Sequence, residues 1–435
     1  MNRLVASEIL TSGWCPLNCH YCYIPKSPQM KKIHRRITRS LKDGSYIRNL
    51  KRIYDSQSLE SLGLWGTEPT LTLDIIRSQI PKFVEAFPKL KTISFSTCGL
   101  FVESLERFIR VLNGYNIGVD IQISVDGPAF ITDKNRAVGV AKKVPENFSR
   151  LLSSIQDVKT KVSFRWKTTL TIENLQEINA DTSKIDKYWE YFEDLYKRFS
   201  KINQNERITL YARESLPTLA VPGRYTSKDG RIFAQFLRNL HRKGHKTAYT
   251  FRLKRILNFW DELGIKKSMF TCSGGDSNTG IGKNLHICHR SFYLDEDEYV
   301  DSILQQKGIE NWDVSYFERG MINLLRDFYI VDPSDKADLS RFFYTMRSYH
   351  DFWKLQIGYT RAMMIELASV NQVNKEYLEN EELSVLFTLF AASALSCPME
   401  QLLNTGVIHF MPSSLLRLFG NGAFKELLND TTRRK

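Results

Sequence analysis

The chain has 435 residues, of which 42% are hydrophobic and 25% are charged, so it is long and apolar enough for two or three globular domains. Residues 1–13 show neither a secretory signal nor a transit peptide. The longest charge-free apolar stretch, 383–399, is interrupted by polar residues and a proline, which excludes a membrane span. The seven cysteines do not predict a disulfide framework. We therefore expect a cytoplasmic protein that makes no membrane contact and uses its cysteines as thiolate ligands.

Short β-rich runs alternate with polar, helical stretches in the first half of the chain, which predicts parallel strands joined by crossover helices. The expected strands lie at 4–10, 59–65, 92–96, 119–125, 161–169 and 208–211. The expected helices lie at 39–55, 73–87, 102–112, 147–155, 185–199 and 229–242. Six such units predict an α/β fold, a partial (β/α)6 barrel with its chemistry at the carboxyl ends of the strands.

The first helical stretch is strongly basic. Between Lys26 and Arg52, ten lysines and arginines stand against one acid, Asp43, and this stretch supplies much of the net charge of +13. Such a run is either a solvated face of a helix or a docking surface for an anionic partner, such as a nucleic acid or an acidic peptide.

The pattern changes beyond residue 247. A loop rich in Gly, Ser and Asn is expected at 273–284, and from 308 onward apolar residues at helical spacing predict a mostly helical domain. We therefore predict three domains, at 1–247, 248–307 and 308–435.

Three cysteines, Cys15, Cys19 and Cys22, follow the first expected strand with the spacing CxxxCxxC. Three thiolates at this spacing can bind three irons of a [4Fe-4S] cube and leave the fourth iron open. Two other interpretations remain, a zinc site with His20 as the fourth ligand and cysteines with a structural role.

The cysteine motif resembles the signature of the radical S-adenosylmethionine (SAM) superfamily, in which an aromatic residue precedes the third cysteine, as Tyr21 does here. The resemblance implies a partial barrel of the radical SAM type, whose cluster cleaves SAM to form a 5′-deoxyadenosyl radical. It also implies that SAM is bound by Tyr21 and by residues that follow the second, third and fourth expected strands. These residues are Gly66, Thr67, Glu68, Pro69, Thr97, Ser124, Asp126 and Arg136.

Two of these turns carry most of the resemblance. Residues 66–69 are similar to the Gly-Gly-Glu-Pro element that holds the SAM amino group, with Thr67 in place of the second glycine. Residues 124–136 resemble the Ser-x-Asp-Gly-Pro and Asp-x-x-Arg segment of peptide-modifying members such as anaerobic sulfatase maturases. By this resemblance Ser124 and Arg136 contact SAM, and the Arg136 guanidinium pairs with its carboxylate.

The remaining cysteines divide into two groups. Cys98 is expected to be a small buried residue rather than a ligand. Cys272 and Cys288 bracket a glycine-rich segment that resembles the opening of a SPASM or twitch extension, a module that holds auxiliary iron–sulfur clusters. Only Cys397 follows downstream, although such a module needs several further cysteines. An auxiliary cluster on these three cysteines and a degenerate module without a cluster both stay open.

The resemblance implies a radical SAM enzyme that takes a hydrogen atom from a peptide or protein, with a flavodoxin or ferredoxin as its one-electron donor. The net charge leaves modification of RNA, DNA or a nucleotide as an alternative. A non-catalytic iron–sulfur scaffold is a third hypothesis. No catalytic residue can be assigned for the substrate, but Arg165, Lys167 and Arg213 lie near strand ends and face either the cavity or the surface.

Overall fold

The computed structural model describes residues 6–22, 24, 28–54 and 56–211, together with 217–219, 232, 235–236, 239, 277–281, 284–286, 330–332 and 334–337. The chain divides into two compact units. The first contains Met1–Thr168, Phe192–Arg213 and Ser273–His350, and the second contains Thr169–Tyr191, Glu214–Cys272 and Asp351–Lys435. The predicted domain boundaries near 247 and 307 lie outside the described residues and stay predictions.

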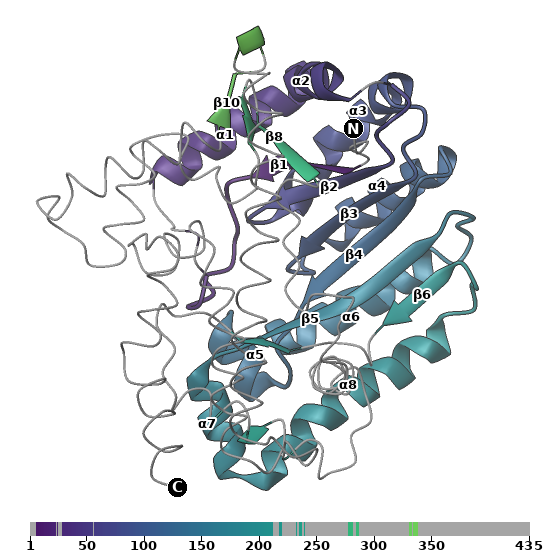
Figure 1. The fold of residues 1–435 in the computed structure, drawn as a ribbon. Coiled ribbons are helices and arrows are strands. Elements are labelled where there is room, and N and C mark those ends of the chain that lie inside the picture. Colours follow the sequence, from purple (N-terminus) through teal and green to yellow (C-terminus); the bar gives the residue numbers. More distant parts are fainter. Residues whose placement is uncertain are drawn as a thin grey trace, which may run out of the picture. The chain divides into compact units, whose positions relative to one another are not determined.

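The first unit contains a sheet whose strands are mostly parallel (Figure 1). Neighbouring strands in the sequence are neighbours in the sheet, and each pairs with the next in parallel. The strands are β1 (Ala6–Ser12), β2 (Ser61–Gly66), β3 (Thr92–Thr97), β4 (Gly118–Ser124), β5 (Val162–Leu170) and β6 (Ile208–Tyr211). The predicted α/β fold with six parallel strands is confirmed, and each strand lies within two residues of its expected bounds.

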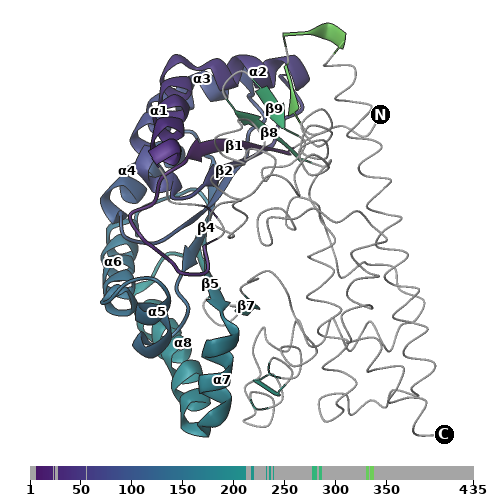
Figure 2. The same ribbon diagram turned by 90° about the vertical axis from the view of Figure 1, so that its left-hand side faces the viewer.

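Helices connect these strands and cover one face of the sheet, as Figure 2 shows for α3, α4 and α6. The helices of this part of the chain are α1 (Pro28–Asp43), α2 (Ser45–Ile53), α3 (Leu73–Ala86), α4 (Val102–Gly114), α5 (Ala129–Asn135), α6 (Val140–Ser154) and α8 (Thr182–Ile202). A short 3-10 helix, η1 (Pro69–Thr72), follows β2.

Alternation along the strands separates the two faces of the sheet. In β4, Val119, Ile121 and Ile123 are buried, whereas Asp120 and Gln122 between them are half-buried. Strands of a parallel sheet covered on both faces are usually apolar throughout. The alternation therefore marks a sheet with helices on one side and a polar face on the other, as in a barrel with a polar interior.

An aromatic cluster joins the helices to the apolar face. The ring of Phe148 on α6 lies 4.8 Å from that of Phe164 and 5.3 Å from that of Trp166, both on β5. Phe199 on α8 is 4.6 Å from Phe148 and stacks on Trp166 at 5.5 Å. Edge-to-face and stacked pairs of this kind add to the free energy gained from burial, and they hold β5 in place beside β4.

The helix expected at 39–55 is wrong in its bounds. Helix α1 begins at Pro28, and α2 is a separate helix because Gly44 between them adopts a left-handed conformation with φ 69°. The basic run hides an apolar stripe on α1, since Met30, Ile33, Ile37 and Leu41 are buried at helical spacing. Six basic residues on the rest of this helix are exposed, namely Lys31, Lys32, Arg35, Arg36, Arg39 and Lys42.

The loop expected at 273–284 is also corrected in part. Residues Ser277–Ile281 form β8, which pairs in parallel with β1 and extends the sheet at its edge. Asn284–His286 form β9, antiparallel to β8, and Ile330–Val331 form β10, antiparallel to β9. Pairing with an existing strand supplies backbone hydrogen bonds, so context overrides the low strand propensity of Ser, Asn and Gly. Apart from β8 to β10 and residues 332 and 334–337, the SPASM/twitch-like region and the helical domain expected from 308 lie outside the described residues.

The second unit is described mainly by residues 169–191. Helix α7 (Ile172–Ala180), which the sequence did not predict, begins with a capping box in which Thr171 and Asn174 exchange side-chain to backbone hydrogen bonds. Phe236 belongs to the same unit, and its ring lies 5.7 Å from that of Tyr188. Strand β7 (Pro217–Leu219) also belongs to this unit. Among the described residues, no helix is both long and apolar enough to cross a membrane.

Two glycines provide a test of the close approach between β1 and β2. A Cβ on Gly66, which has φ +145°, would lie 2.3 Å from the Ser12 carbonyl oxygen, whereas a Cβ on Gly139, with φ +84°, would meet nothing within 4 Å. We expect Gly139→Ala to cost about 1 kcal/mol of stability through backbone strain alone. Gly66→Ala adds a steric clash and should cost about 3 kcal/mol or more. Thermal unfolding of both variants measures the difference, and equal losses would contradict the close approach.

Candidate functional site at the carboxyl edge of the sheet

The predicted site residues gather at one edge of the sheet. Because the strands are parallel, the loops that follow β1, β2, β3 and β4 all begin at this edge. The cysteine loop follows β1, Gly66 ends β2 and is followed by residues 67–69, Thr97 ends β3, and Ser124 ends β4. Ser124 is half-buried and is paired in register with Lys167 on β5.

The cysteine loop presents three cysteines, none of which forms a disulfide. Cys15, Cys19 and Cys22 are each partly exposed, and a turn in which the Cys22 amide donates to the Cys19 carbonyl at 2.9 Å brings the second and third together. Burial raises the pKa of the Cys15 thiol to about 12, with further contributions from the negative charge of Glu68 and from the other two cysteines. Cys19 and Cys22 therefore lie close enough to Cys15 to interact with it electrostatically.

In the described part of the chain, no three His, Cys, Asp or Glu side chains converge as ligands of a metal ion. The thiolates of a [4Fe-4S] cube each bind a separate iron rather than one shared ion. The number, chemistry and partial exposure of the thiols on this loop fit such a cluster.

Glu68 is a buried carboxylate that joins the ends of β2 and β3. It is 1% exposed, and its Oε1 accepts hydrogen bonds from the hydroxyls of Thr97, at 2.7 Å, and Thr70. The amide of Cys98 donates to Oε2 at 2.6 Å. Burial and the nearby Glu68 charge raise the pKa of the Cys98 thiol, which keeps this thiol neutral, in line with its expected place as a small buried residue.

Thr67 stands where the family element has glycine, and its side chain has a structural contact. Its amide donates to the Ser12 carbonyl at 3.0 Å, and its hydroxyl donates to the Trp14 carbonyl at 2.5 Å. The Ser12 hydroxyl donates to the same Trp14 carbonyl at 2.9 Å. These bonds fix the backbone directly before Cys15.

Asp126 anchors the other end of the cysteine loop. This fully buried carboxylate accepts hydrogen bonds from the Tyr21 hydroxyl at 2.9 Å and from the Asn135 side chain at 3.3 Å. Arg136 binds it with two nitrogens, Nε at 2.9 Å and Nη2 at 2.8 Å. The backbone of His20 also donates to the Asn135 carbonyl at 3.2 Å. Hydrogen bonds therefore hold residues 20 and 21 against the end of β4 and against α5.

The sequence missed two members of these networks. Thr70 binds Glu68, and its signal is the helix-start pattern in which Glu68 caps η1 and Pro69 occupies the first turn. Asn135 binds Asp126 and has no comparable signal in a single sequence.

Among the possible substrate residues, Arg165 lies on the polar face of the sheet. It forms an ion pair with Asp120 on β4, and its guanidinium lies 5.6 Å from the ring centre of Tyr211 on β6. Lys167 lies on the same face and is half-buried. Arg213 and the three cysteines proposed for an auxiliary cluster, Cys272, Cys288 and Cys397, lie outside the described residues.

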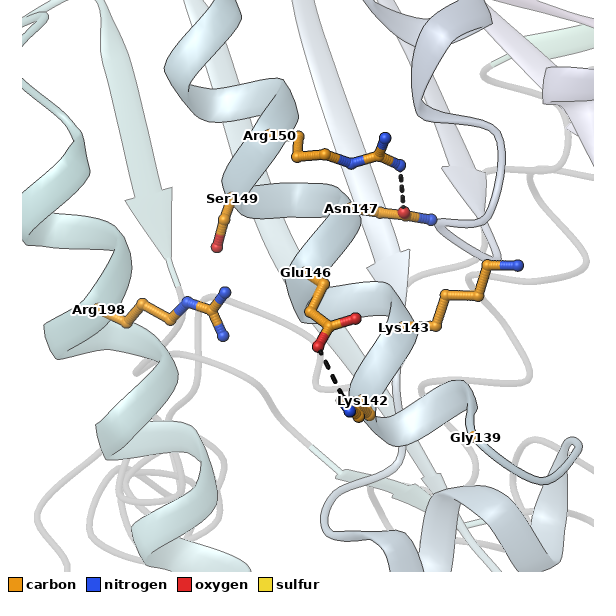
Figure 3. A pocket seen from close by; sticks show the side chains of 8 residues that line it. All are labelled: Gly139, Lys142, Lys143, Glu146, Asn147, Ser149, Arg150 and Arg198. Carbon is orange, nitrogen blue, oxygen red and sulfur yellow. Dashed lines mark hydrogen bonds and ion pairs between the residues drawn. The ribbon is translucent and has the colours of Figure 1, made fainter.

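A separate pocket lies beside α6 and α8 and includes no residue of the carboxyl edge. Several of its lining residues are basic, but Figure 3 shows Arg198 and Lys143 on different sides of α6, so these charges do not converge. Lys142 pairs with Glu146 at 3.9 Å, and Arg150 donates to the Asn147 side chain at 2.7 Å. The carboxyl edge therefore remains the candidate functional site.

Comparison with protein families settles the type of domain. Residues 9–172 match the family model of the radical SAM superfamily, and this range contains the cysteine loop and the ends of β1 to β5. The chain carries a radical SAM domain. The cofactors of radical SAM enzymes are a [4Fe-4S] cluster and SAM, and the described thiols fit the first of them.

Other comparisons add nothing to the radical SAM assignment. No curated protein matches the sequence. The structure is similar to that of native anSMEcpe with bound AdoMet, at 19% identity and a TM-score of 0.39, over 65% of this chain and 74% of that chain. A second similar structure is native anSMEcpe with bound AdoMet and Kp18Cys peptide, at 16% identity and a TM-score of 0.40, over 70% and 84% of the two chains. Similarity at this level does not transfer a substrate or a mechanism.

The Glu68 network predicts a stability loss that an exposed carboxylate does not share. Glu68→Gln replaces an oxygen that accepts hydrogen bonds with an amide group that cannot accept them, so we expect a loss of about 2–3 kcal/mol. The matched control is Glu60→Gln, which removes the partner of exposed Lys91 and should cost less than about 1 kcal/mol. Chemical denaturation of both variants measures the two losses, and a Glu68→Gln variant as stable as the control would contradict the buried network.

Proposed function

We propose that Cys15, Cys19 and Cys22 hold the [4Fe-4S] cluster of this radical SAM enzyme. The observation that carries the proposal is a loop of three cysteines, none of them in a disulfide, at the carboxyl edge of the sheet. This loop lies within the matched domain, and hydrogen bonds hold it at both ends. When bound, the cluster and SAM supply a one-electron cleavage that yields a 5′-deoxyadenosyl radical able to take a hydrogen atom from an unreactive carbon.

The protein's part in this chemistry is positioning. We propose that backbone groups of residues 66–69, together with Thr97 and Ser124, bind SAM beside the cysteine loop, because these residues end neighbouring strands. The oxygens of Glu68 already accept four hydrogen bonds from protein groups. Its main role is therefore to hold the ends of β2 and β3 in fixed positions, and contact with the SAM amino group is secondary. Fixed strand ends lower the entropic cost of bringing reactants together.

A peptide or protein side chain is the proposed substrate. Support comes from residues 124–136, whose sequence resembles that of peptide-modifying members, and from the polar face of the sheet with Asp120, Gln122, Arg165 and Lys167. These side chains could bind a peptide backbone through hydrogen bonds. An acidic one-electron carrier, a flavodoxin or ferredoxin, is the proposed reductant and suits a chain with a net charge of +13.

Nucleic acid is the second candidate substrate, and a specific observation favours it. The six basic side chains on the exposed face of α1 have few acidic neighbours in that helix, which contains only Asp43. Phosphate contacts made by such a face are sensitive to salt, because binding releases counterions.

The proposal predicts the iron content and the reaction of the purified protein. After anaerobic reconstitution, we expect about four irons per chain and formation of 5′-deoxyadenosine when SAM and a reductant are added. The triple variant Cys15→Ala/Cys19→Ala/Cys22→Ala should lose both, whereas Cys98→Ala should keep both, because Cys98 is buried and bonded to Glu68.

Other outcomes of that experiment distinguish the alternatives. About eight irons, of which about four survive in the triple variant, would favour an auxiliary cluster on Cys272, Cys288 and Cys397. Iron without SAM cleavage would favour the non-catalytic iron–sulfur scaffold. Zinc in place of iron would contradict the proposed [4Fe-4S] cluster.

Salt dependence separates the two substrate classes. We expect acidic peptides to bind the reconstituted protein with little loss of affinity between about 50 and 200 mM salt. A protein that makes many phosphate contacts, in contrast, loses roughly 10³-fold or more in affinity over this range. Fluorescence anisotropy with labelled peptide and labelled RNA measures both affinities. Tight, strongly salt-dependent RNA binding that Arg35→Gln/Arg39→Gln weakens would favour the nucleic acid instead.

A further inference from the structure

Arg136 links the buried Asp126 carboxylate to a cysteine of the loop. Its Nε and Nη2 bind the two oxygens of Asp126 at 2.9 and 2.8 Å. Its third nitrogen, Nη1, lies 4.0 Å from Cys19 Sγ, within the range of a hydrogen bond to sulfur. Only 7% of the Arg136 side chain is exposed, and Asp126 is fully buried.

We propose that Arg136 is a positioning residue that donates an N–H bond to the Cys19 sulfur and thereby raises the reduction potential of the cluster. The inference rests on the proposed function, since it takes Cys19 as a cluster ligand. Reduction adds negative charge to the cluster and its thiolates, and a hydrogen-bond donor beside a thiolate stabilises that charge. Hydrogen bonds to the sulfurs are one of the means by which proteins set the potentials of iron–sulfur clusters.

The surroundings of Arg136 fix the direction of its third nitrogen. A guanidinium is planar, so two bonds to one carboxylate leave it little freedom to rotate. The Tyr21 ring centre lies 5.6 Å from the guanidinium carbon, and the Tyr21 hydroxyl donates to the same Asp126 carboxylate. Tyr21 and Cys19 belong to the same loop, so the residues that orient the guanidinium also orient the sulfur it faces.

This role differs from the one implied by family resemblance, in which Arg136 pairs with the SAM carboxylate. Asp126 binds the edge of the guanidinium that carries Nε and Nη2. The third nitrogen, Nη1, faces Cys19. A contact with sulfur acts whether or not SAM is present, whereas a contact with the SAM carboxylate acts only when SAM is bound. The cluster's potential without SAM therefore separates the two roles.

The test is a redox titration of the reconstituted, SAM-free enzyme, followed by electron paramagnetic resonance of the reduced cluster. Arg136→Lys keeps the charge pair with Asp126, but an ammonium held by that carboxylate cannot also reach Cys19. We expect the potential to become more negative with no loss of iron. The control is Arg107→Lys, because Arg107 binds Asp74 with the same two nitrogens on the protein surface. Its potential should equal that of the wild type.

A second variant keeps the test decisive if the first does not fold. Arg136→Gln keeps a side-chain N–H that can donate to Asp126, whose carboxylate still accepts from Tyr21 and Asn135, but it places no guanidinium beside Cys19. It should also shift the potential to a more negative value.

The possible results separate this inference from the proposed function. Wild type that binds no iron overturns both. Wild type with its cluster, and an Arg136→Lys variant with the same iron content and the same potential, overturns only the inference. An Arg136→Lys variant that binds SAM more weakly but has an unchanged potential without SAM also overturns only the inference.

Discussion

The site depends on one buried carboxylate, that of Asp126. A buried charge is stable only when it is paired and hydrogen-bonded. Asp126 is bound by groups from two parts of the chain. These are Tyr21 in the cysteine loop, Asn135 at the end of α5 and Arg136 just after it. The pairing that stabilises the charge therefore also fixes the loop. Our central claim is that these contacts order the cysteine loop before any cofactor binds.

A second buried carboxylate holds the opposite side of the site. Glu68 draws together the ends of β2 and β3, and the close approach of Gly66 to Ser12 lets Thr67 bind the backbone before Cys15. The loop is thus fixed at its start by β2 and near its end by β4 and α5. The sheet beneath supplies the frame, because its parallel register brings these strand ends to one edge.

The sequence was sufficient for the frame, and the residues that it predicts for the site lie together at one edge of the sheet. Alternating apolar runs located β1 to β6. Glu68, Thr97 and Asp126 lie at the ends of these strands or just after them. The sequence was not sufficient to predict which side chains the site residues contact. The contacts of Arg136 depend on which side chains are buried together, and a motif does not specify this. The basic run concealed the apolar stripe of α1, and β8 owes its pairing to β1 rather than to its own propensity.

Hydrogen exchange of the cysteine loop in the metal-free protein tests the central claim most directly. The His20 amide is bonded to the Asn135 carbonyl and the Cys22 amide to the Cys19 carbonyl, so both should exchange more slowly than in an unstructured peptide. Asp126→Asn should remove this protection while the amides of β3 and β4 keep theirs. Exchange of the wild-type loop at the rate of an unstructured peptide would contradict the account, since it would mean that the cofactor, and not the buried carboxylate, orders the loop.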